Sequence, residues 1–295
     1  MKNGATLHLT LDVERDYGRA DTYRALDAAG PLFAWTEKTG LPLTAFVAGE
    51  ILERGHPIVE TLLKAGIPIA LHGHAHAAAA FGTMRTSHAD EIERAVQAYA
   101  SRIGKRPHGY RAPAGIISRT DLMLLDQLGF AYDASIFPMR RPHRYDFSRL
   151  PRAPFRWEGT RLAEVPFGLM TSSLPAGLTF INLLGPAASA ALIGRAARKL
   201  AGQSPSGSAP SGYVIDLHGH NLFAYPPALR ALPVALRLVY RAGRWSGGLA
   251  CLMSLADKLR RRGFTFGNLE ADALRLDPEK LPAVGFDCFE RRARA

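Results

Sequence analysis

The sequence predicts an α/β protein built around a parallel sheet or barrel, and three observations carry this prediction. Of the 295 residues, 47% are hydrophobic and 21% are charged, which is the composition of a globular protein. Short apolar runs alternate with longer helix-like segments along residues 1–135. The length fits one large domain or two small ones, and a single barrel-like domain is sufficient. Since strands separated by helices pair in parallel, functional groups should gather at the carboxyl ends of the strands.

The expected elements follow from apolar periodicity. The first strand begins almost at once, where Leu7, Leu9 and Leu11 alternate with polar residues. The predicted strands are Ala5–Leu11, Leu43–Val47, Ile67–Leu71, the short stretch before Arg111, Tyr213–Leu217 and Phe264–Phe266. The predicted helices are Thr22–Lys38, Pro57–Ala65, Ser87–Ile103 and Ser118–Leu128.

Three segments interrupt this alternation. Residues 136–165 are rich in Pro and Arg and are expected to form a long surface connection. The stretch from Val165 to Gly194 has no charged residue, but its prolines and glycines break it too often for a simple membrane-spanning helix. The composition of Gln203–Gly212 predicts a flexible linker. We therefore expect a single domain over residues 1–295, with an insert at 165–212 and a basic tail at 268–295.

Charge and cysteine content restrict the partners and the compartment. With 37 Lys+Arg and 26 Asp+Glu, the net charge is 37 − 26 = +11, which suits nucleic acid, an anionic membrane or an acidic substrate. The usual nucleic-acid-binding motifs are missing, so we expect no nucleic-acid partner. Two cysteines exclude a disulfide framework and a four-cysteine zinc site. The sequence starts without the apolar run of a signal sequence, which predicts a cytoplasmic protein.

Two polar motifs follow predicted strands in the first quarter of the chain. Asp12 and Glu14 come at the end of the first strand, where two carboxylates at i and i+2 can turn into one cleft. Taken alone they could equally be solvated loop acids. His72, His74 and His76 follow the third strand, and one helical turn would place His72 and His76 on the same side. Imidazole is a good ligand for zinc, nickel, cobalt or iron, although such a cluster can also be an incidental surface feature.

Two more motifs follow later strands. Arg111 begins the segment Arg-Ala-Pro-Ala-Gly, in which a rigid turn can orient a carboxylate and present backbone N–H groups. Its simpler interpretation is a turn with a surface arginine. His218 ends the apolar strand Tyr213–Leu217 and could be a general acid, or a hydrogen-bonded core residue.

In this order the four segments resemble the polysaccharide deacetylase family, carbohydrate esterase family four. The resemblance spans about residues 5–135 and 213–267. The family motifs are an acidic pair, His-x-x-x-His, Arg-x-Pro-x-Gly and a strand ending in His, here Asp12 with Glu14, His72 with His76, Arg111–Gly115 and His218. The resemblance implies the family fold, an irregular (β/α) barrel, with residues 165–212 as an apolar insert.

The resemblance also implies one divalent metal ion, held by Glu14, His72 and His76. Two imidazoles and one carboxylate leave coordination positions open, as in catalytic rather than structural sites. We expect zinc, with cobalt, nickel, manganese or iron as alternatives, because nitrogen and oxygen sites accept several ions.

The reaction implied is the hydrolysis of an N-acetyl or N-formyl group on an amino sugar. The implied roles are Asp12 as general base, Arg111 as the ion-pair partner of Asp12, the N–H of Ala114 as an oxyanion donor and His218 as the acid that protonates the leaving amine. The residues expected to contact the substrate are His74, Tyr110, Pro113 and Ala114.

The sequence departs from the family pattern in two places. The family's acidic pair is commonly an adjacent Asp-Asp, whereas here one residue separates Asp12 from Glu14. A spaced pair occurs in branches that act on non-polymeric substrates. The acidic fourth motif of the family is indistinct here, and Asp133 after Tyr132 and Asp216 are alternative candidates for it.

A cytoplasmic member needs a cytoplasmic N-acyl sugar, and a polyprenyl-linked sugar at the inner face of the membrane is the candidate substrate. In residues 226–245 one predicted helical stripe is apolar, formed by Leu229, Leu232, Leu236 and Val239. Another is basic, formed by Arg230, Arg237, Arg241 and Arg244. Such a helix suits the surface of an anionic membrane, although both stripes could instead pack on the barrel. Two rival functions remain open: hydrolysis of a small soluble amide, as in allantoinase, and non-catalytic binding of a glycan or membrane.

Overall fold

A computed structural model describes residues 5–75, 87–142, 144–202, 212–243 and 248–289. Its main sheet has ten strands. In chain order they are β1 (Thr6–Val13), β2 (Leu43–Val47), β3 (Ile69–Leu71), β4 (Gly109–Tyr110), β5 (Tyr132–Asp133), β8 (Phe155–Trp157), β9 (Ala163–Glu164), β10 (Tyr213–His218), β11 (Thr265–Gly267) and β12 (Ala283–Val284). A separate hairpin pairs β6 (Arg140–Arg141) with β7 (Tyr145–Asp146).

The main sheet runs in the order β10-β1-β2-β3-β4-β5-β9-β8-β12, with β11 also paired to β1. All of its strand pairs are parallel except β8 with β9. The predicted α/β class is therefore confirmed. Among the described strands no ladder closes the sheet into a barrel. Isolated parallel bridges, Phe167 to Val214 and Gly177 to Asp216, instead bring the chain after β9 alongside β10.

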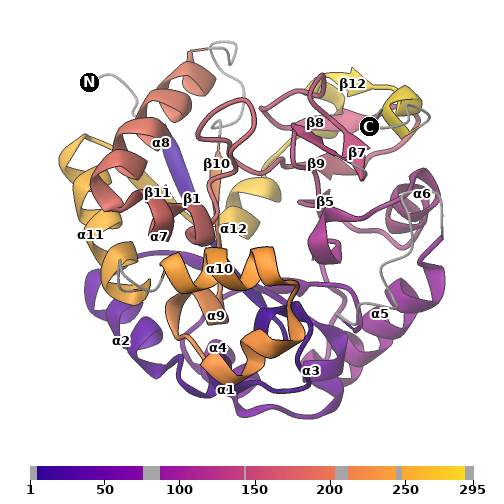
Figure 1. Ribbon diagram of the computed structural model, residues 1–295. Coiled ribbons are helices and arrows are strands. Elements are labelled where there is room, and N and C mark those ends of the chain that lie inside the picture. The colour runs from indigo at the N-terminus through magenta and orange to yellow at the C-terminus, as the bar shows by residue number, and fades with distance from the viewer. Residues whose placement is uncertain (1–4, 76–86, 143, 203–211, 244–247, 290–295) are drawn as a thin grey trace.

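Helices surround this sheet (Figure 1). They are α1 (Arg24–Asp27), α2 (Gly30–Thr39), α3 (Gly49–Glu53), α4 (Pro57–Lys64), α5 (Ala89–Ile103), α6 (Arg119–Gln127), α7 (Leu178–Leu184), α8 (Pro186–Ala201), α9 (Gly219–Leu222), α10 (Val234–Gly243), α11 (Gly248–Arg261) and α12 (Leu269–Ala273). The single helix expected over Thr22–Lys38 was wrong, because the structure has two helices there. The break falls before Pro31, whose missing N–H suits the first turn of a new helix.

The segment 136–165 is also different from the expected surface connection. It carries β6 to β9, and the side chains of Phe147, Phe155 and Trp157 are almost completely buried. Trp157 packs edge-on against Phe155 and stacks on Phe286 near the C-terminus. The many prolines and arginines hid this aromatic core, because each aromatic residue is flanked by polar ones.

The uncharged stretch from Val165 to Gly194 contains α7 and about the first half of α8. Residues 203–211 of the expected linker lie outside the described part of the chain. Among the described helices, none combines the length and the apolar character needed to cross a bilayer. The division of the chain into one domain with an insert and a basic tail stays a prediction.

The amphipathic helix expected over residues 226–245 is shorter than predicted. Pro226–Ala231 form the 3₁₀ helix η3, and Pro233 separates it from α10. Leu229 and Leu232 are buried, so they do not continue the stripe. The apolar side chains that α10 exposes most are Val234 and Leu238.

Candidate functional site

Two neighbouring parallel strands bring the first and last motifs together. Side chains two residues apart on a strand point to the same side, so Thr10 and Asp12 share a face on β1, as do Asp216 and His218 on β10. The register pairs Thr10 with Asp216 and Asp12 with His218. Glu14 directly follows the carboxyl end of β1. Strand pairing alone therefore gathers acids and an imidazole at one edge of the sheet.

His72, which follows β3, completes what we call the acid–imidazole cluster: Asp12, Glu14, His72 and His218. The Nε2 atom of His72 lies 3.6 Å from Asp12 Oδ2 and 3.4 Å from Glu14 Oε2. The Nε2 atom of His218 lies 3.7 Å from Asp12 Oδ2 and 3.7 Å from Glu14 Oε1. Asp12, Glu14 and His72 are almost fully buried, whereas a quarter of the His218 side chain is exposed.

The donor set of this cluster fits a divalent metal ion. Ligand atoms about 2.0–2.2 Å from a tetrahedral ion are about 3.3–3.6 Å apart, close to the spacings across the cluster and longer than hydrogen bonds. The Nδ1 atom of His72 lies 3.1 Å from the carbonyl oxygen of Arg111. Since a carbonyl only accepts, Nδ1 carries the proton and Nε2 offers its lone pair to the cluster.

A second grouping of donors overlaps the first. One ligand atom each from Asp12, Asp216 and His218 lie within 4.8 Å of one another. Asp216 is therefore a further candidate ligand at the same edge of the sheet. The third predicted ligand, His76, lies outside the described residues, and its role stays a prediction.

Arg111 holds the buried acids in place. Its Nη1 atom donates to Asp12 Oδ1 at 2.6 Å and approaches Asp216 Oδ1 at 3.3 Å. The guanidinium carbon lies 3.9 Å from the ring centre of Phe46 and 4.4 Å from that of Phe167, so the buried cation is compensated by acids and aromatic faces. The pairing of Arg111 with Asp12 is the one that the family resemblance implies.

The charges of the cluster shift the pKa values of its members in different directions. Burial would raise the pKa of Asp12, but Arg111 and the two imidazoles outweigh it and hold that pKa below its usual range. Burial would lower the pKa of His218, yet the carboxylates of Asp216, Glu14 and Asp12 raise it. Asp12 is therefore a carboxylate at neutral pH, and protonation of His218 is favoured.

Asp216, rather than Asp133, supplies the extra acid of the site. The Nδ1 atom of His218 lies 3.3 Å from Asp216 Oδ2, and burial raises the pKa of Asp216 to about 7. Asp133 is fully buried and accepts from the Ser135 hydroxyl at 2.6 Å, while that hydroxyl accepts from the N–H of Ala112 at 2.7 Å. Asp133 thus supports the backbone next to Arg111.

The loop after β3 and the loop after β4 pack closely against each other. Gly73 has a φ of 59°, and a Cβ atom there would lie 2.8 Å from the ring of Pro113. Tyr110 is buried, with its hydroxyl near Gly73 and its ring edge-on to Phe130. These contacts fix His72 relative to Arg111. The predicted substrate contacts of Tyr110 and Pro113 stay predictions.

Ala114 has a φ of 55°, a conformation that non-glycine residues rarely adopt. Among the described non-glycine residues only Tyr17 shares this property. Ala114 lies within the Arg111–Gly115 motif, and Tyr17 comes three residues after Glu14. Backbone strain of this kind persists where the surrounding structure imposes it, often at functional sites. The Ala114 N–H stays the predicted oxyanion donor, and its carbonyl accepts from Arg141 Nη1 at 3.2 Å.

His74 points away from the cluster. Its Nε2 atom lies 3.0 Å from Glu53 Oε1, and its ring packs over Gly49 at the start of α3. Its predicted substrate contact therefore lacks support in the contacts seen here.

Sequence reasoning missed the residues that surround the cluster. Phe46 and Phe167 cover Arg111, and Thr10 accepts from its Nη1 atom at 2.9 Å. One signal was present, because Thr10-x-Asp12 and Asp216-x-His218 both place polar residues two apart in otherwise buried strands. Phe46 and Phe167 resemble ordinary core residues and gave no such signal.

A mostly parallel sheet with acids, imidazoles and a buried arginine at its carboxyl edge defines a class of α/β proteins with a polar site at the strand ends. Within that class, residues 21–132 match the family model of polysaccharide deacetylase. This match confirms the resemblance to the family over residues 21–132. It covers His72, His76 and Arg111, while Asp12, Glu14 and His218 lie outside it.

A curated relative and two solved structures are similar to the chain. A peptidoglycan deacetylase-like protein of Gibberella zeae is 29% identical over 109 residues, which cover 36% of this chain and 32% of the relative. The alignment thus spans about a third of that relative. An allantoinase superposes with a TM-score of 0.55 at 17% identity, covering 92% of this chain and 91% of its own. A carbohydrate esterase family four pseudoenzyme from Bacillus anthracis gives a TM-score of 0.52 at 10% identity, covering 97% and 70%. At these identities the structures support the fold alone.

Proposed function

We propose that this chain is a metal-dependent hydrolase that removes an N-acetyl or N-formyl group from an amino sugar. The observation that carries this proposal is the acid–imidazole cluster, in which His72 Nε2 and Glu14 Oε2 lie 3.4 Å apart, the spacing of two ligands on one ion, with Asp12 and His218 beside them. The family match supplies the reaction class, since the matched family is that of the polysaccharide deacetylases.

Glu14 and His72, with His76, would hold the ion. Zinc fits this donor set best, although cobalt, nickel, manganese and iron bind similar ligands. When bound, the ion lowers the pKa of water and polarises the amide oxygen.

Asp12 is the proposed general base. Its carboxylate is kept ionised by Arg111, so it can accept a proton from the attacking water at Oδ2, the oxygen that faces the imidazoles. Arg111 occupies Oδ1 and thereby leaves Oδ2 for the proton. The pair fixes the direction of the base as well as its charge.

His218 is the proposed general acid. Asp216 faces its Nδ1 atom, which leaves Nε2 directed at the cluster. With its pKa raised, a protonated His218 can deliver the Nε2 proton to the leaving amine. The Ala114 N–H would donate a hydrogen bond to the developing oxyanion.

The substrate we propose is a polyprenyl-linked sugar at the inner face of the cytoplasmic membrane, where the protein would lie peripherally. Helices α7 and α10 contact each other, and their exposed apolar side chains are Leu183, Leu184, Val234, Leu236 and Leu238. Arg230 and Arg241 are exposed nearby in the sequence. An apolar and basic surface of this kind supports binding to an anionic membrane.

Two measurements test this function. Purified protein loaded with zinc or cobalt should release acetate or formate from an N-acyl amino sugar and leave allantoin unchanged. Mass spectrometry of lipid-linked sugars should show the N-acyl form accumulating in cells that lack the protein. Turnover of allantoin in place of amino sugars would establish the small-amide reading. Metal binding without any turnover would establish a non-catalytic relative.

A further inference from the structure

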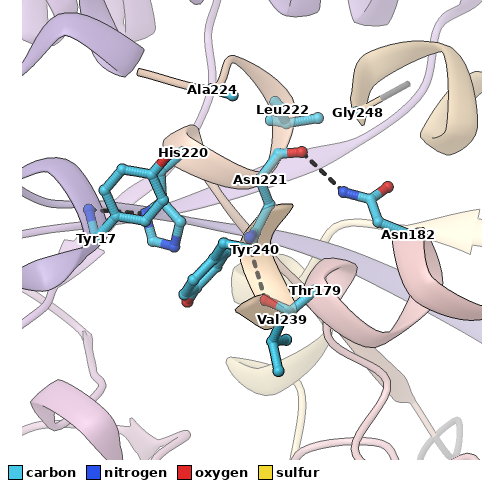
Figure 2. Close-up of a pocket in the computed structure, with 10 residues that line it drawn as sticks. All are labelled: Tyr17, Thr179, Asn182, His220, Asn221, Leu222, Ala224, Val239, Tyr240 and Gly248. Atoms are coloured by element: carbon cyan, nitrogen blue, oxygen red, sulfur yellow. Dashed lines mark hydrogen bonds between the residues drawn. The ribbon is translucent and has the colours of Figure 1, made fainter. Parts of the chain in front are cut away.

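A pocket beside the acid–imidazole cluster has no role in the chemistry described above. It has a volume of about 200 Å³ and lies between α7, α9, α10 and the 3₁₀ helix η1 (Asp16–Gly18). Figure 2 shows the side chains that line it. The lining includes Tyr17, Thr179, Asn182, His220, Val239 and Tyr240.

The pocket adjoins the cluster through His220. The ring centres of His220 and His218 are 5.0 Å apart, and η1 begins two residues after Glu14. The Nδ1 atom of His220 accepts from the N–H of Tyr17 at 3.2 Å, which fixes the ring and the strained backbone of Tyr17 together. Only the ring of His220 would therefore separate a ligand in the pocket from His218, the proposed general acid.

Three rings form one wall of this pocket. Tyr17 and His220 have ring centres 4.7 Å apart, and Tyr240 meets them edge-on at 5.0 and 5.3 Å. Thr179 and Asn182 of α7 add polar groups beside these rings, and Thr179 is hydrogen-bonded to Tyr240. Thr179 donates to Asn221 Oδ1 at 3.2 Å, and Asn182 Nδ2 donates to the carbonyl of Asn221 at 2.9 Å. Aromatic rings next to hydroxyl and amide groups suit a ligand ring with apolar C–H faces and hydroxyl edges.

The lack of charged side chains in the lining further restricts the class of ligand. None of the ten residues that line this pocket is Lys, Arg, Asp or Glu. Phosphates and carboxylates are bound by Arg, Lys or clustered N–H groups, which this wall does not supply. Pockets for drug-sized ligands have volumes of about 300–1,000 Å³. This pocket is smaller, so it suits a single ring.

We propose that this pocket binds one neutral sugar ring of the substrate, next to the N-acyl group held at the acid–imidazole cluster. The proposal rests on the proposed function and names the part of the chain that recognises the sugar. Because α7 belongs to the apolar stretch and α10 follows η3, this recognition would come from segments outside the matched residues 21–132.

The test fills the pocket without touching the cluster. Val239 lines the pocket from α10, and Val234 on the same helix is 62% exposed and lies outside the lining. We expect Val239→Trp to weaken binding of N-acetylglucosamine by about tenfold or more, while the matched control Val234→Trp binds as the wild type does. Binding is measured by saturation-transfer NMR, which needs no turnover.

A second pair of variants keeps the test valid if Val239→Trp fails to fold. Tyr240→Phe should weaken sugar binding about threefold to tenfold, because one hydroxyl is lost, whereas Tyr225→Phe outside the lining should not. The two control variants, Val234→Trp and Tyr225→Phe, should also hydrolyse para-nitrophenyl acetate, which has no sugar ring, as the wild type does. Sugar binding that survives Val239→Trp and Tyr240→Phe would overturn the proposal, as would displacement of the sugar by octanol. If the wild type bound the sugar but hydrolysed no N-acyl amino sugar, the proposed function would be overturned and the pocket proposal would not.

Discussion

Gly73 has a position that only glycine can occupy without strain. Its φ of 59° lies in the left-handed region, and Pro113 of the neighbouring loop sits where a Cβ atom would be. Gly66 has a similar φ of 64° but no atom within 4 Å of its hypothetical Cβ. Substituting these two glycines by alanine therefore distinguishes the cost of backbone strain from the cost of disturbing the packing between the two loops.

We predict that Gly66→Ala costs about 1–2 kcal/mol of unfolding free energy, the usual price of a left-handed alanine. Gly73→Ala should cost about 1–3 kcal/mol more, because Pro113 must move. The movement should also displace His72 and weaken metal binding. Denaturant unfolding and zinc titration measure both effects, and equal losses in the two variants would disprove the packing argument.

The pair Asp12 and Glu14 should respond differently to removal of charge. Asp12→Asn should retain metal but lower turnover by about 10²–10⁴-fold, because it removes the general base. Glu14→Gln should lose metal as well as turnover, because it removes a ligand. Metal content by mass spectrometry and melting temperature are measured beside the kinetics. The Asp12 variant should keep its fold, because Asp216 still faces Arg111. Full activity of Asp12→Asn would remove Asp12 from the mechanism.

At the scale of elements, the start of α6 depends on one carboxylate. Asp121 forms a capping box with Ser118, and it also accepts from the N–H and the ring of His88 at 2.7 Å each. Burial would raise the pKa of Asp121, but these hydrogen bonds outweigh it and lower the pKa. The carboxylate therefore joins the loop before α5 to the beginning of α6.

Asp121→Asn should destabilise the protein by about 1–2 kcal/mol at pH 7. Because the folded pKa lies below the unfolded one, this stabilisation is complete above the unfolded pKa of about 4 and is lost as the pH falls through the folded pKa. The difference between variant and wild type should therefore shrink in acid. Asp90→Asn, at an exposed position of α5, is the control for loss of a carboxylate in a helical first turn. A difference that stays constant from pH 7 to pH 3 would refute the assignment.

The elements show what a sequence reveals and what it hides. Strands β1, β2 and β10 were predictable, because each is a run of at least five residues that is almost wholly buried. The strands β8 and β9 were not, since each is only two or three residues long and lies among prolines and arginines. Arg111 was found as a motif, but its aromatic partners Phe46 and Phe167 come from separate elements that only the tertiary structure brings together.

At the scale of the whole molecule, charge and apolar exposure coincide near α10. Arg230 and Arg241 are exposed, and Val234 and Leu238 project apolar surface from the same region. Each arginine near an anionic surface contributes about 1 kcal/mol, so the two together supply about 2 kcal/mol. The formal charge of +11 adds a less specific attraction.

We predict that the protein floats with anionic liposomes more than with neutral ones and is partly released by salt. The double variant Arg230→Glu/Arg241→Glu should weaken this binding by tenfold or more, about what the loss of 2 kcal/mol implies. Lys105→Glu/Arg106→Glu, at exposed positions after α5, makes the same change in net charge at another surface. Equal losses in both double variants would show that net charge alone, not the α10 surface, governs binding.

The parallel register of β1 with β10 has a consequence for how the protein is made. Helices α1 to α8 separate the two strands along the chain, yet Asp12 and His218 meet across their ladder. During translation β1 emerges early and can pair with β2, but its other edge must wait until β10 leaves the ribosome. Contacts so distant in sequence form slowly. A nascent chain interrupted before Tyr213 would carry Asp12, Glu14 and His72 without Asp216 and His218 of β10. The site is therefore completed only late in synthesis.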